Sequence, residues 1–351
     1  MKIAFVLPRD KNDAIGGFKV VYEYANRLLK RGHEVTIIYN NTNTLERYQI
    51  PLSIKQFVIK TRTKWYPTWF NLDDRIIKDT YFGGVYKDNS FDAIFATSVG
   101  SVKPTLEAFP KGNVFYLIQD YENWHNSNEY VDTTYKMGMH NVVVSKWLKE
   151  IVFNVTGETP FLISNPIDLN IYKMNIPIED RNPYSIGLLY HSNPNKGLQY
   201  SFDALQRLKM IYPQLHVEMF GNPKIQNELP SWIHYTRKAT TQQTVEIYNS
   251  VAVFMCSSID EGFGLTGMEA MACGATLASS EYTGVKEYAK NEYNALLSPV
   301  KDVDAMVKNV RCLIENCEMR KKLYKNAQTL LKDRTWDKCV ELLESTIIST
   351  L

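Results

Sequence analysis

The chain is poor in cysteine, and its few cysteines stand in no arrangement that binds a metal. The five cysteines among 351 residues form no Cys-x-x-Cys pair and no Cys/His spacing typical of zinc. This excludes a metal-stapled or disulfide-stapled class and favours reduced thiols in a cytoplasmic protein. Apolar runs of membrane-spanning length are also missing. The apolar run within residues 1–9 is too short for a secretory signal, so we expect it to form a first strand.

An excess of charge of either sign is missing too. The chain has 40 Lys and Arg residues against 38 Asp and Glu, which leaves a net charge of +2. This balance argues against a nucleic-acid partner. Hydrophobic residues make up 44% and charged residues 22%, as in ordinary globular proteins, and the length suffices for two domains with a core each.

The most informative stretch covers residues 257–274, SSIDEGFGLTGMEAMACG. It follows an apolar run, 251–256, that is typical of a buried strand, and its glycines precede a run of good helix formers. A strand, a glycine loop and a helix in this order point free backbone N–H groups beyond the strand end, where they favour an anion. Glu261 and Glu269 flank the loop. Two acids suit a nucleotide sugar better than a bare anion, because carboxylates can bind the hydroxyls of a ribose and of a sugar.

This string resembles the Glu-x7-Glu signature of family four of the GT-B retaining glycosyltransferases. The residues that match in order are Ser257, Glu261, Gly262, Phe263, Gly264, Glu269, Ala270 and Met271. The resemblance implies that Glu269 binds ribose hydroxyls and that Glu261 lies against the transferred sugar. It also implies that the donor diphosphate is held by the amides of the turn, at Gly264, Leu265 and Thr266. A purely structural strand-to-helix junction is the alternative for the glycines and glutamates.

A second part of the resemblance follows a predicted strand at residues 184–190. The family's pattern there is Gly-Arg, four residues, then Lys-Gly, and the lysine falls on Lys196 while His191 replaces the arginine. Lys196 would neutralise the diphosphate and His191 would also contact it. An unperturbed imidazole titrates near ~6.5, so His191 supplies at most part of a charge. We therefore expect a weaker phosphate grip, or one shared with Arg237 or Lys238, and a solvated loop lysine is the alternative for Lys196.

The first half opens with a predicted strand at 2–7 and a helix at 18–31, joined by a loop that ends in Gly16 and Gly17. The full Gly-x-Gly-x-x-Gly pattern is missing, so a dinucleotide site is poorly supported. In the resembled family this loop faces the donor, which makes Gly17 a predicted donor contact. A tight strand-to-helix turn is the alternative.

Polar residues follow another predicted strand, 114–118, and side chains that leave such a strand end face ligands. Many members of the family carry a His-Asp pair here, whereas this chain has Gln119 before Asp120. The string Gln-Asp-Tyr-Glu resembles that of rhamnosyltransferases that build bacterial surface glycans. We predict that Gln119 and Glu122 bind the acceptor, and that Asp120 binds an acceptor hydroxyl or accepts its proton. A strand cap with polar surface residues is the alternative.

Residues 41–90 are less regular and mix basic with aromatic side chains, at Lys60, Arg62, Lys64, Trp65, Tyr66, Trp69 and Phe70. Such a mix suits a membrane interface or a lipid-linked acceptor. It equally suits a partly packed surface loop that leads into a helix near residues 73–78, and we favour this second interpretation.

The resemblance implies an α/β GT-B fold, with two Rossmann-like domains that face a cleft. We predict a first, acceptor-binding domain at 1–165, completed by a final helix within 335–351 that crosses back to it. A linker at 166–183 then leads to the donor-binding domain at 184–334.

The predicted reaction is transfer of a sugar, with retention, from a UDP-, GDP- or dTDP-sugar to a hydroxyl of a saccharide or lipid-linked acceptor. We expect it to serve cell-surface polysaccharide or glycoconjugate synthesis in the cytoplasm, at the inner face of the plasma membrane where the protein contacts it. No cofactor or metal is expected, because no Asp-x-Asp stands at a likely phosphate site, and Asp302-Val-Asp304 suits a helix cap better.

Two other functions remain open from the sequence. One is a nucleotide-sugar epimerase on the same fold. The other is a non-catalytic, glycosyltransferase-like scaffold subunit, which the exchanges at Gln119 and His191 favour and the intact Lys196, Glu261 and Glu269 oppose.

Overall fold

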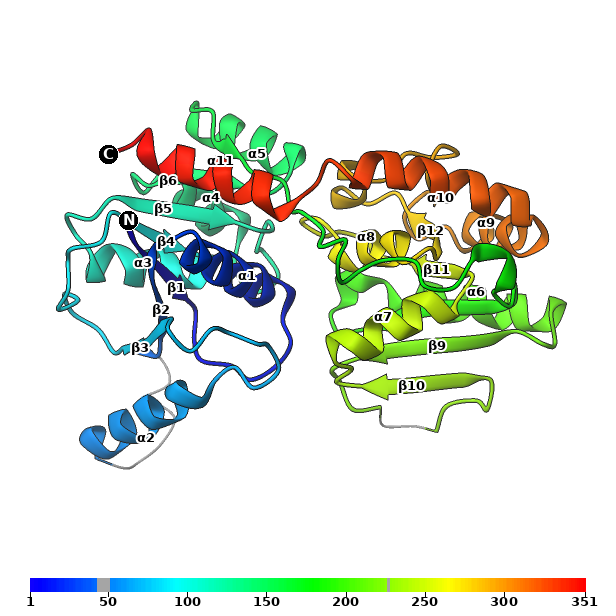
Figure 1. Cartoon of the computed structure of the whole chain (residues 1–351), viewed down its shortest axis with the longest axis horizontal. Coiled ribbons are helices and arrows are strands. Elements are labelled where there is room, and N and C mark those ends of the chain that lie inside the picture. Colours follow the sequence, from blue (N-terminus) through cyan, green and yellow to red (C-terminus); the bar gives the residue numbers. More distant parts are fainter. Residues whose placement is uncertain (43–50, 226–227) are drawn as a thin grey trace. The chain divides into compact units, whose positions relative to one another are not determined.

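The structure, a computed structural model, describes residues 1–42, 51–225 and 228–351. Its contacts divide this part of the chain into two compact units. Residues 1–164 and 337–351 form the first unit, and residues 165–336 form the second. Figure 1 labels the elements of both units. We predicted that the first domain ends at residue 165 and that the chain returns to it from residue 335.

The first unit is built on a parallel sheet with the strand order β3-β2-β1-β4-β5-β6-β7. Its strands are β1 (Lys2–Leu7), β2 (Glu34–Asn40), β3 (Ile77–Tyr81), β4 (Ala93–Ala96), β5 (Val114–Ile118), β6 (His140–Val143) and β7 (Phe161–Leu162). Every residue of β4 and β5 is buried, as expected for central strands of a parallel sheet covered by helices. The chain builds one side of the sheet with β2 and β3 and the other from β4 onward. The switch point therefore lies between β1 and β4.

The helices of this unit are α1 (Gly16–Lys30), α2 (Leu52–Trp65), α3 (Val99–Ala108), α4 (Asn128–Tyr135), α5 (Lys146–Thr156) and the last helix, α11 (Trp336–Ile348). Glu344 of α11 accepts hydrogen bonds from Arg31 and lies 2.6 Å from Nε2 of His33. Asn113 Nδ2 donates to the hydroxyl of Thr350, just beyond the helix. The predicted return of the last helix to the first domain is thus confirmed (Figure 1).

The prediction for residues 41–90 is wrong in part. Residues 77–81 form the edge strand β3 and not a helix near 73–78, and the helix of this region is α2. β3 pairs with β2 from Ile77, opposite Thr36, to Tyr81, opposite Asn40. Pairing with a neighbouring strand decides the conformation of so short a segment, and its local sequence does not reveal it. Residues 43–50, which also fall within this prediction, lie outside the described part of the chain.

The second unit is also built on a parallel sheet, with the strand order β10-β9-β8-β11-β12-β13. Its strands are β8 (Ser185–Tyr190), β9 (His216–Gly221), β10 (Ile233–Arg237), β11 (Val253–Cys256), β12 (Thr276–Ser280) and β13 (Leu296–Ser298). Its helices are α6 (Leu198–Ile211), α7 (Thr241–Ser250), α8 (Leu265–Ala272), α9 (Val303–Glu315) and α10 (Cys317–Leu331). The switch point of this sheet lies between β8 and β11. Two Rossmann-like parallel-sheet units are therefore present, as predicted.

Residues 166–183, where we predicted a linker, pack as part of the second unit. The guanidinium of Arg181 donates to four backbone carbonyls, those of Ile176, Tyr248, Val251 and Cys273. These bonds fasten the segment to α7 and α8, because a buried cation needs several acceptors. In the described part of the chain, no helix combines the length and the apolar character that crossing a membrane requires.

Candidate functional site

Two strands of the second unit that are neighbours at the switch point, β8 and β11, lead into the predicted site residues. Lys196 ends the short 3-10 turn η3 (Pro194–Lys196) after β8, and Glu261 and Gly264 follow β11. Ligands of open parallel sheets bind beyond the strand ends at such a point. The fold therefore places Lys196 and Glu261 on adjoining loops at the position where a ligand is expected.

Lys196 and Glu261 form an ion pair, with 2.6 Å between Nζ of the lysine and Oε2 of the glutamate. The other carboxylate oxygen of Glu261 accepts a hydrogen bond from the hydroxyl of Ser258. The side chain of Glu261 is 10% exposed and that of Lys196 is 23% exposed. Partial burial strengthens the attraction relative to a surface pair, while both groups still reach water. An ammonium and a carboxylate thus stand side by side, able to bind a phosphate and a hydroxyl.

His191 lies beside this pair as a neutral imidazole. Burial lowers its pKa, the Lys196 ammonium lowers the pKa further, and the Glu261 carboxylate acts weakly in the opposite direction. Nδ1 of His191 accepts a hydrogen bond of 3.0 Å from the backbone N–H of Asn193. The proton of the neutral ring therefore sits on Nε2. His191 can donate a hydrogen bond near neutral pH but brings no full charge to a phosphate.

The two loops are locked together through their backbones. The carbonyl of Asn195 accepts from the N–H of Ile259 at 2.6 Å, and the hydroxyl of Ser257 donates to the carbonyl of Gly197 at 2.8 Å. Gly197 has a φ of +58°, and a Cβ there would overlap the carbonyl oxygen of Ser257. Only glycine fits this close approach. The position of Lys196 is therefore tied to the start of the loop that carries Glu261.

The glycine turn before α8 rests on two buried tyrosines. Gly264 has a φ of +86°, and a Cβ there would overlap the hydroxyl of Tyr282. The hydroxyl of Tyr288 donates to the carbonyl of Gly264 at 2.7 Å and lies 3.0 Å from the hydroxyl of Tyr282. Because Tyr288 uses its proton on the carbonyl, Tyr282 is the donor between the two phenols. The turn is thus held from below by a chain of two hydrogen bonds.

The start of α8 is the part of this turn that reaches the surface. Leu265 and Thr266 are half-exposed, whereas residues 261–264 and 267–275 are buried. The first N–H groups of a helix have no partner within it and carry a partial positive charge. Of the predicted amides, those of Leu265 and Thr266 therefore belong to partly exposed residues at a helix start, which suits an anion, whereas Gly264 is buried.

Glu269 lies one turn further along α8, on the face of Leu265. It is buried, and its Oε2 accepts a hydrogen bond of 3.1 Å from the hydroxyl of Tyr248. Burial, followed by the nearby Glu269, keeps the pKa of Tyr248 well above its ordinary value. Tyr248 thus acts as a permanent donor that fixes the direction of the Glu269 carboxylate.

In the first unit, the structure brings Gly17 and Gln119 into contact. Nε2 of Gln119 donates to the carbonyl of Gly17 at 3.3 Å and to the carbonyl of Thr97 at 3.4 Å. A Cβ at position 17 would lie 3.2 Å from the same nitrogen. Gln119 thus ties the start of α1 to the end of β4, at the switch point of this sheet.

Asp120 and Glu122 follow Gln119 in the loop after β5. Asp120 Oδ1 accepts from the N–H of Tyr121 at 2.8 Å, and Glu122 Oε2 accepts from the N–H of Val99, the first residue of α3, at 3.1 Å. Burial raises the pKa of Glu122 to about 8, and the charge of Asp120 adds to the rise, against the bond from Val99. Glu122 is therefore mostly protonated near neutral pH, able to donate as well as accept a hydrogen bond.

Asp302, in the Asp-x-Asp string, caps α9 as expected, since its Oδ1 accepts from the N–H of Ala305 at 2.9 Å. Among the residues that the structure describes, no group of three or more His, Cys, Asp or Glu could hold a metal ion.

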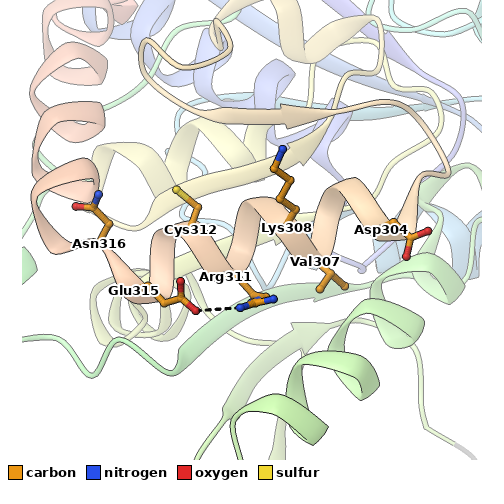
Figure 2. A pocket seen from close by; sticks show the side chains of 7 residues that line it. All are labelled: Asp304, Val307, Lys308, Arg311, Cys312, Glu315 and Asn316. Carbon is orange, nitrogen blue, oxygen red and sulfur yellow. Dashed lines mark hydrogen bonds and ion pairs between the residues drawn. The ribbon is translucent and has the colours of Figure 1, made fainter.

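A groove on the outer side of α9 contains none of the predicted residues. Figure 2 shows its lining, which consists of Asp304, Val307, Lys308, Arg311, Cys312, Glu315 and Asn316. Three of its charged side chains are paired: Arg311 with Glu315, and Asp304 with Arg207 of α6. Tyr212, the residue after α6, also donates to Glu315. This groove therefore gives no support for a second substrate site.

Residues 177–330, most of the second unit, match the family described as Glycosyl transferases group 1. The second unit is a glycosyl transferases group 1 domain. Lys196, Glu261, the glycine turn and Glu269 all lie within the matched residues of this glycosyltransferase domain.

Known proteins resemble the chain over parts of their length. An uncharacterized glycosyltransferase of Methanocaldococcus jannaschii is 24% identical over 204 residues, which are 57% of this chain and 56% of that protein. An N,N'-diacetylbacillosaminyl-diphospho-undecaprenol alpha-1,3-N-acetylgalactosaminyltransferase of Campylobacter jejuni is 30% identical over 95 residues, 27% of this chain and 25% of that protein. The chain thus spans about half or less of the length of these relatives.

A solved structure resembles the chain over its full length. HepE of Anabaena, in complex with UDP and glucose, superposes with a TM-score of 0.75 at 15% identity and covers 100% of both chains. This likeness confirms the predicted α/β GT-B fold class, with the glycosyltransferase domain as the second of two Rossmann-like domains.

Four residues that support the glycosyltransferase domain's site escaped the sequence analysis: Tyr248, Ser258, Tyr282 and Tyr288. Tyr248, Ser258 and Tyr288 each donate a hydrogen bond to a predicted residue, to Glu269, Glu261 and Gly264 respectively. Tyr282 acts through Tyr288. Tyr282 and Tyr288 stand in the string EYTGVKEY, which follows β12. The contact of this string with the turn before α8 could not be predicted from the sequence, because it depends on the packing of two loops.

Proposed function

We propose that the protein is a glycosyltransferase that moves a sugar from a nucleoside-diphosphate sugar to a hydroxyl of an acceptor. One observation supports this most directly: the Lys196 ammonium, the Glu261 carboxylate and the open start of α8 all follow strands at the switch point of one sheet. A cation and free amides suit a diphosphate, and an adjacent carboxylate suits a sugar hydroxyl.

We assign the donor to the second unit. Lys196, the Nε2–H of His191 and the amides of Gly264, Leu265 and Thr266 would bind the diphosphate. Glu269, aimed by Tyr248, would accept hydrogen bonds from a ribose, and Glu261 would do so from the transferred sugar. HepE, solved with UDP and glucose, makes a UDP-sugar the first donor to test, before GDP- and dTDP-sugars.

We assign the acceptor to Gln119, Asp120 and Glu122 of the first unit, with Gly17 as a further donor contact. In the proposed step, the acceptor oxygen bonds to the anomeric carbon as the bond from that carbon to the phosphate oxygen breaks. The acceptor's proton passes to the departing phosphate, and Asp120 orients the hydroxyl. Lys196 and the turn amides stabilise the charge that grows on the leaving diphosphate. Attack from the side of the leaving group gives retention.

A relative of the chain suggests the class of acceptor. The Campylobacter relative is named for a substrate linked to diphospho-undecaprenol. We therefore propose a saccharide or lipid-linked acceptor and a role in surface polysaccharide or glycoconjugate synthesis, in the cytoplasm at the inner face of the membrane. The rhamnosyltransferase-like string that begins at Gln119 makes a deoxysugar donor part of the panel.

The test is release of nucleoside diphosphate from a panel of donors, with and without saccharide acceptors. Lys196→Ala should lower kcat/KM by about 10²–10³-fold, because it removes charge stabilisation of the leaving group. Glu269→Ala should mainly raise the donor KM, and Glu261→Ala should mainly lower kcat. Lys308→Ala, in the groove on α9, is the matched control and should leave both constants unchanged.

Unchanged rates in both glutamate variants would remove the assignment. Conversion of the donor without release of nucleotide would point instead to an epimerase. Failure of every donor to raise the melting temperature or to be turned over would leave the scaffold subunit as the better account.

A further inference from the structure

Helix α2 of the first unit turns its apolar side chains away from the protein. Ile54, Phe57, Val58, Thr61 and Trp65 stand at spacings of 3, 4, 7 and 11 from the first, so they share one face, which we name the α2 stripe. Its large members are exposed: Ile54 by 52%, Phe57 by 72%, Val58 by 51% and Trp65 by 74%. Scattered exposed apolar residues are ordinary, but a continuous stripe on one helix marks an interaction surface.

The opposite face fixes this orientation. Ile59 and Thr63 of α2 are buried, and the hydroxyl of Thr63 accepts a hydrogen bond of 2.9 Å from that of Thr80 in β3. The two threonines join α2 to the edge strand, and Figure 1 shows the helix beyond β3 at the margin of the first unit. The stripe therefore cannot turn inward without breaking a buried contact.

The charges of α2 all have one sign. Residues 52–65 contain Lys55, Lys60, Arg62 and Lys64 and no Asp or Glu. At 3.6 residues per turn, Lys60 and Lys64 flank the stripe on one side, and Lys55 and Arg62 flank it on the other. Arg62 makes a bidentate bond to the buried Asp10, at 2.6 and 2.8 Å, which helps to anchor the helix.

We propose that α2 docks the protein on an anionic membrane surface. An apolar stripe with a tryptophan and basic residues on both flanks suits the boundary between headgroups and acyl chains. The lysine ammonium groups would lie at the level of anionic headgroups, which attract juxtamembrane bases. A second copy of the chain is a poorer occupant, because a twofold pairing of two such helices sets basic flanks against basic flanks.

The inference rests on the α2 stripe, and it extends the proposed function in one respect. A lipid-linked acceptor is presented at a membrane, so a docking helix on the acceptor-binding unit would bring enzyme and acceptor to the same surface. Donor binding belongs to the second unit and does not depend on this helix.

The test is co-sedimentation of the full chain with vesicles that contain phosphatidylglycerol, and with vesicles of phosphatidylcholine alone. The protein should bind the anionic vesicles, release as salt is raised, and bind the neutral ones weakly. Phe57→Ser with Trp65→Ser should weaken binding at least about tenfold, through the loss of apolar contact. Lys60→Glu with Lys64→Glu should weaken it by about fivefold or more for each site.

Two matched variants control for surface changes in general. Met210→Ser removes an exposed apolar side chain of α6, and Lys111→Glu with Lys136→Glu makes the same charge change elsewhere on the first unit. Both should bind vesicles like the wild type. UDP binding, measured by calorimetry, should be unchanged in all these variants. A loss of vesicle binding with normal UDP binding would therefore test the membrane proposal apart from the proposed function.

No binding to anionic vesicles, equal binding to neutral ones, or equal losses in the control variants would overturn the proposal. Self-association that the Phe57→Ser and Trp65→Ser changes abolish would assign the stripe to a second copy instead.

Discussion

Replacing Tyr288 by phenylalanine removes the donor on which the glycine turn before α8 rests. The tyrosine hydroxyl donates to the carbonyl of Gly264 and accepts from Tyr282. Tyr288→Phe therefore leaves the buried phenol of Tyr282 without a partner. It also removes one donor from the carbonyl of Gly264, which keeps the N–H of Gly267 at 3.2 Å. Tyr282→Phe leaves the bond to Gly264 in place and removes only the outer bond of the chain.

These two losses differ in size. A buried polar group without a partner costs about 1–3 kcal/mol, whereas a hydrogen bond removed cleanly costs about 0.5–1.5 kcal/mol. We expect Tyr288→Phe to weaken the turn by about 2–4 kcal/mol and Tyr282→Phe by about 1 kcal/mol. The double variant leaves no phenol without a partner, so it should be no worse than Tyr288→Phe alone, a non-additive result.

Amide hydrogen exchange over residues 257–274, read by mass spectrometry, is the appropriate assay, since a protein of two units need not unfold in one step. A loss of about 2 kcal/mol accelerates exchange through local opening roughly thirtyfold. UDP affinity, measured by calorimetry, should fall in the same order, because the turn carries the amides at Leu265 and Thr266. Equal effects of the two single variants, or additive effects in the pair, would refute the reasoning.

Backbone geometry and the half-buried carboxyl of Glu122 give two further predictions. Gly264→Ala should abolish most UDP binding, because it adds overlap with the Tyr282 hydroxyl to the cost of about 1–2 kcal/mol for a side chain at positive φ. Gly138→Ala, with a φ of +77° and nothing within 4 Å of its Cβ, has only the second cost and should bind UDP normally; equal losses would contradict this account. The folded-state pKa of Glu122, about 8, is above its unfolded value near ~4.3, so the stability from its neutral form is complete below the lower value and is lost as pH rises through the higher one. Glu122→Gln should remove this dependence of stability on pH. The melting temperature of the variant, relative to that of the wild type, should therefore rise between about pH 5 and 9. A difference in melting temperature that stays constant over this range would contradict the prediction.

The strand, glycine turn and helix around Glu261 could be predicted because their signals are local. Apolar residues at 251–256 predict a buried strand, and β11 covers Val253–Cys256. Glycine at 264 suits a turn at positive φ, and α8 begins at the next residue. The family resemblance likewise implies two Rossmann-like domains, and both parallel sheets are present.

What could not be predicted depends on contacts between distant segments. β3 is a strand because it pairs with β2. The α2 stripe faces outward because a buried hydrogen bond joins the opposite face of α2 to β3. The neutral state of Glu122 arises from burial beside the start of α3, 23 residues earlier in the chain. The sequence shows which residues are present but not which distant residues surround them in the fold.

Hydrogen bonds join Asn195 and Gly197 to the loop after β11, and in both bonds the acceptor is a backbone carbonyl. The position of Lys196 is therefore independent of the side chains that would select the base or the sugar. Main-chain atoms set the spacing from the Lys196 ammonium to the start of α8. Exchanges of the side chains around them can therefore change which base or sugar fits, while the proposed phosphate site stays constant. Donor preference in this protein should therefore be open to redesign by side-chain replacement alone, provided that position 197 remains glycine.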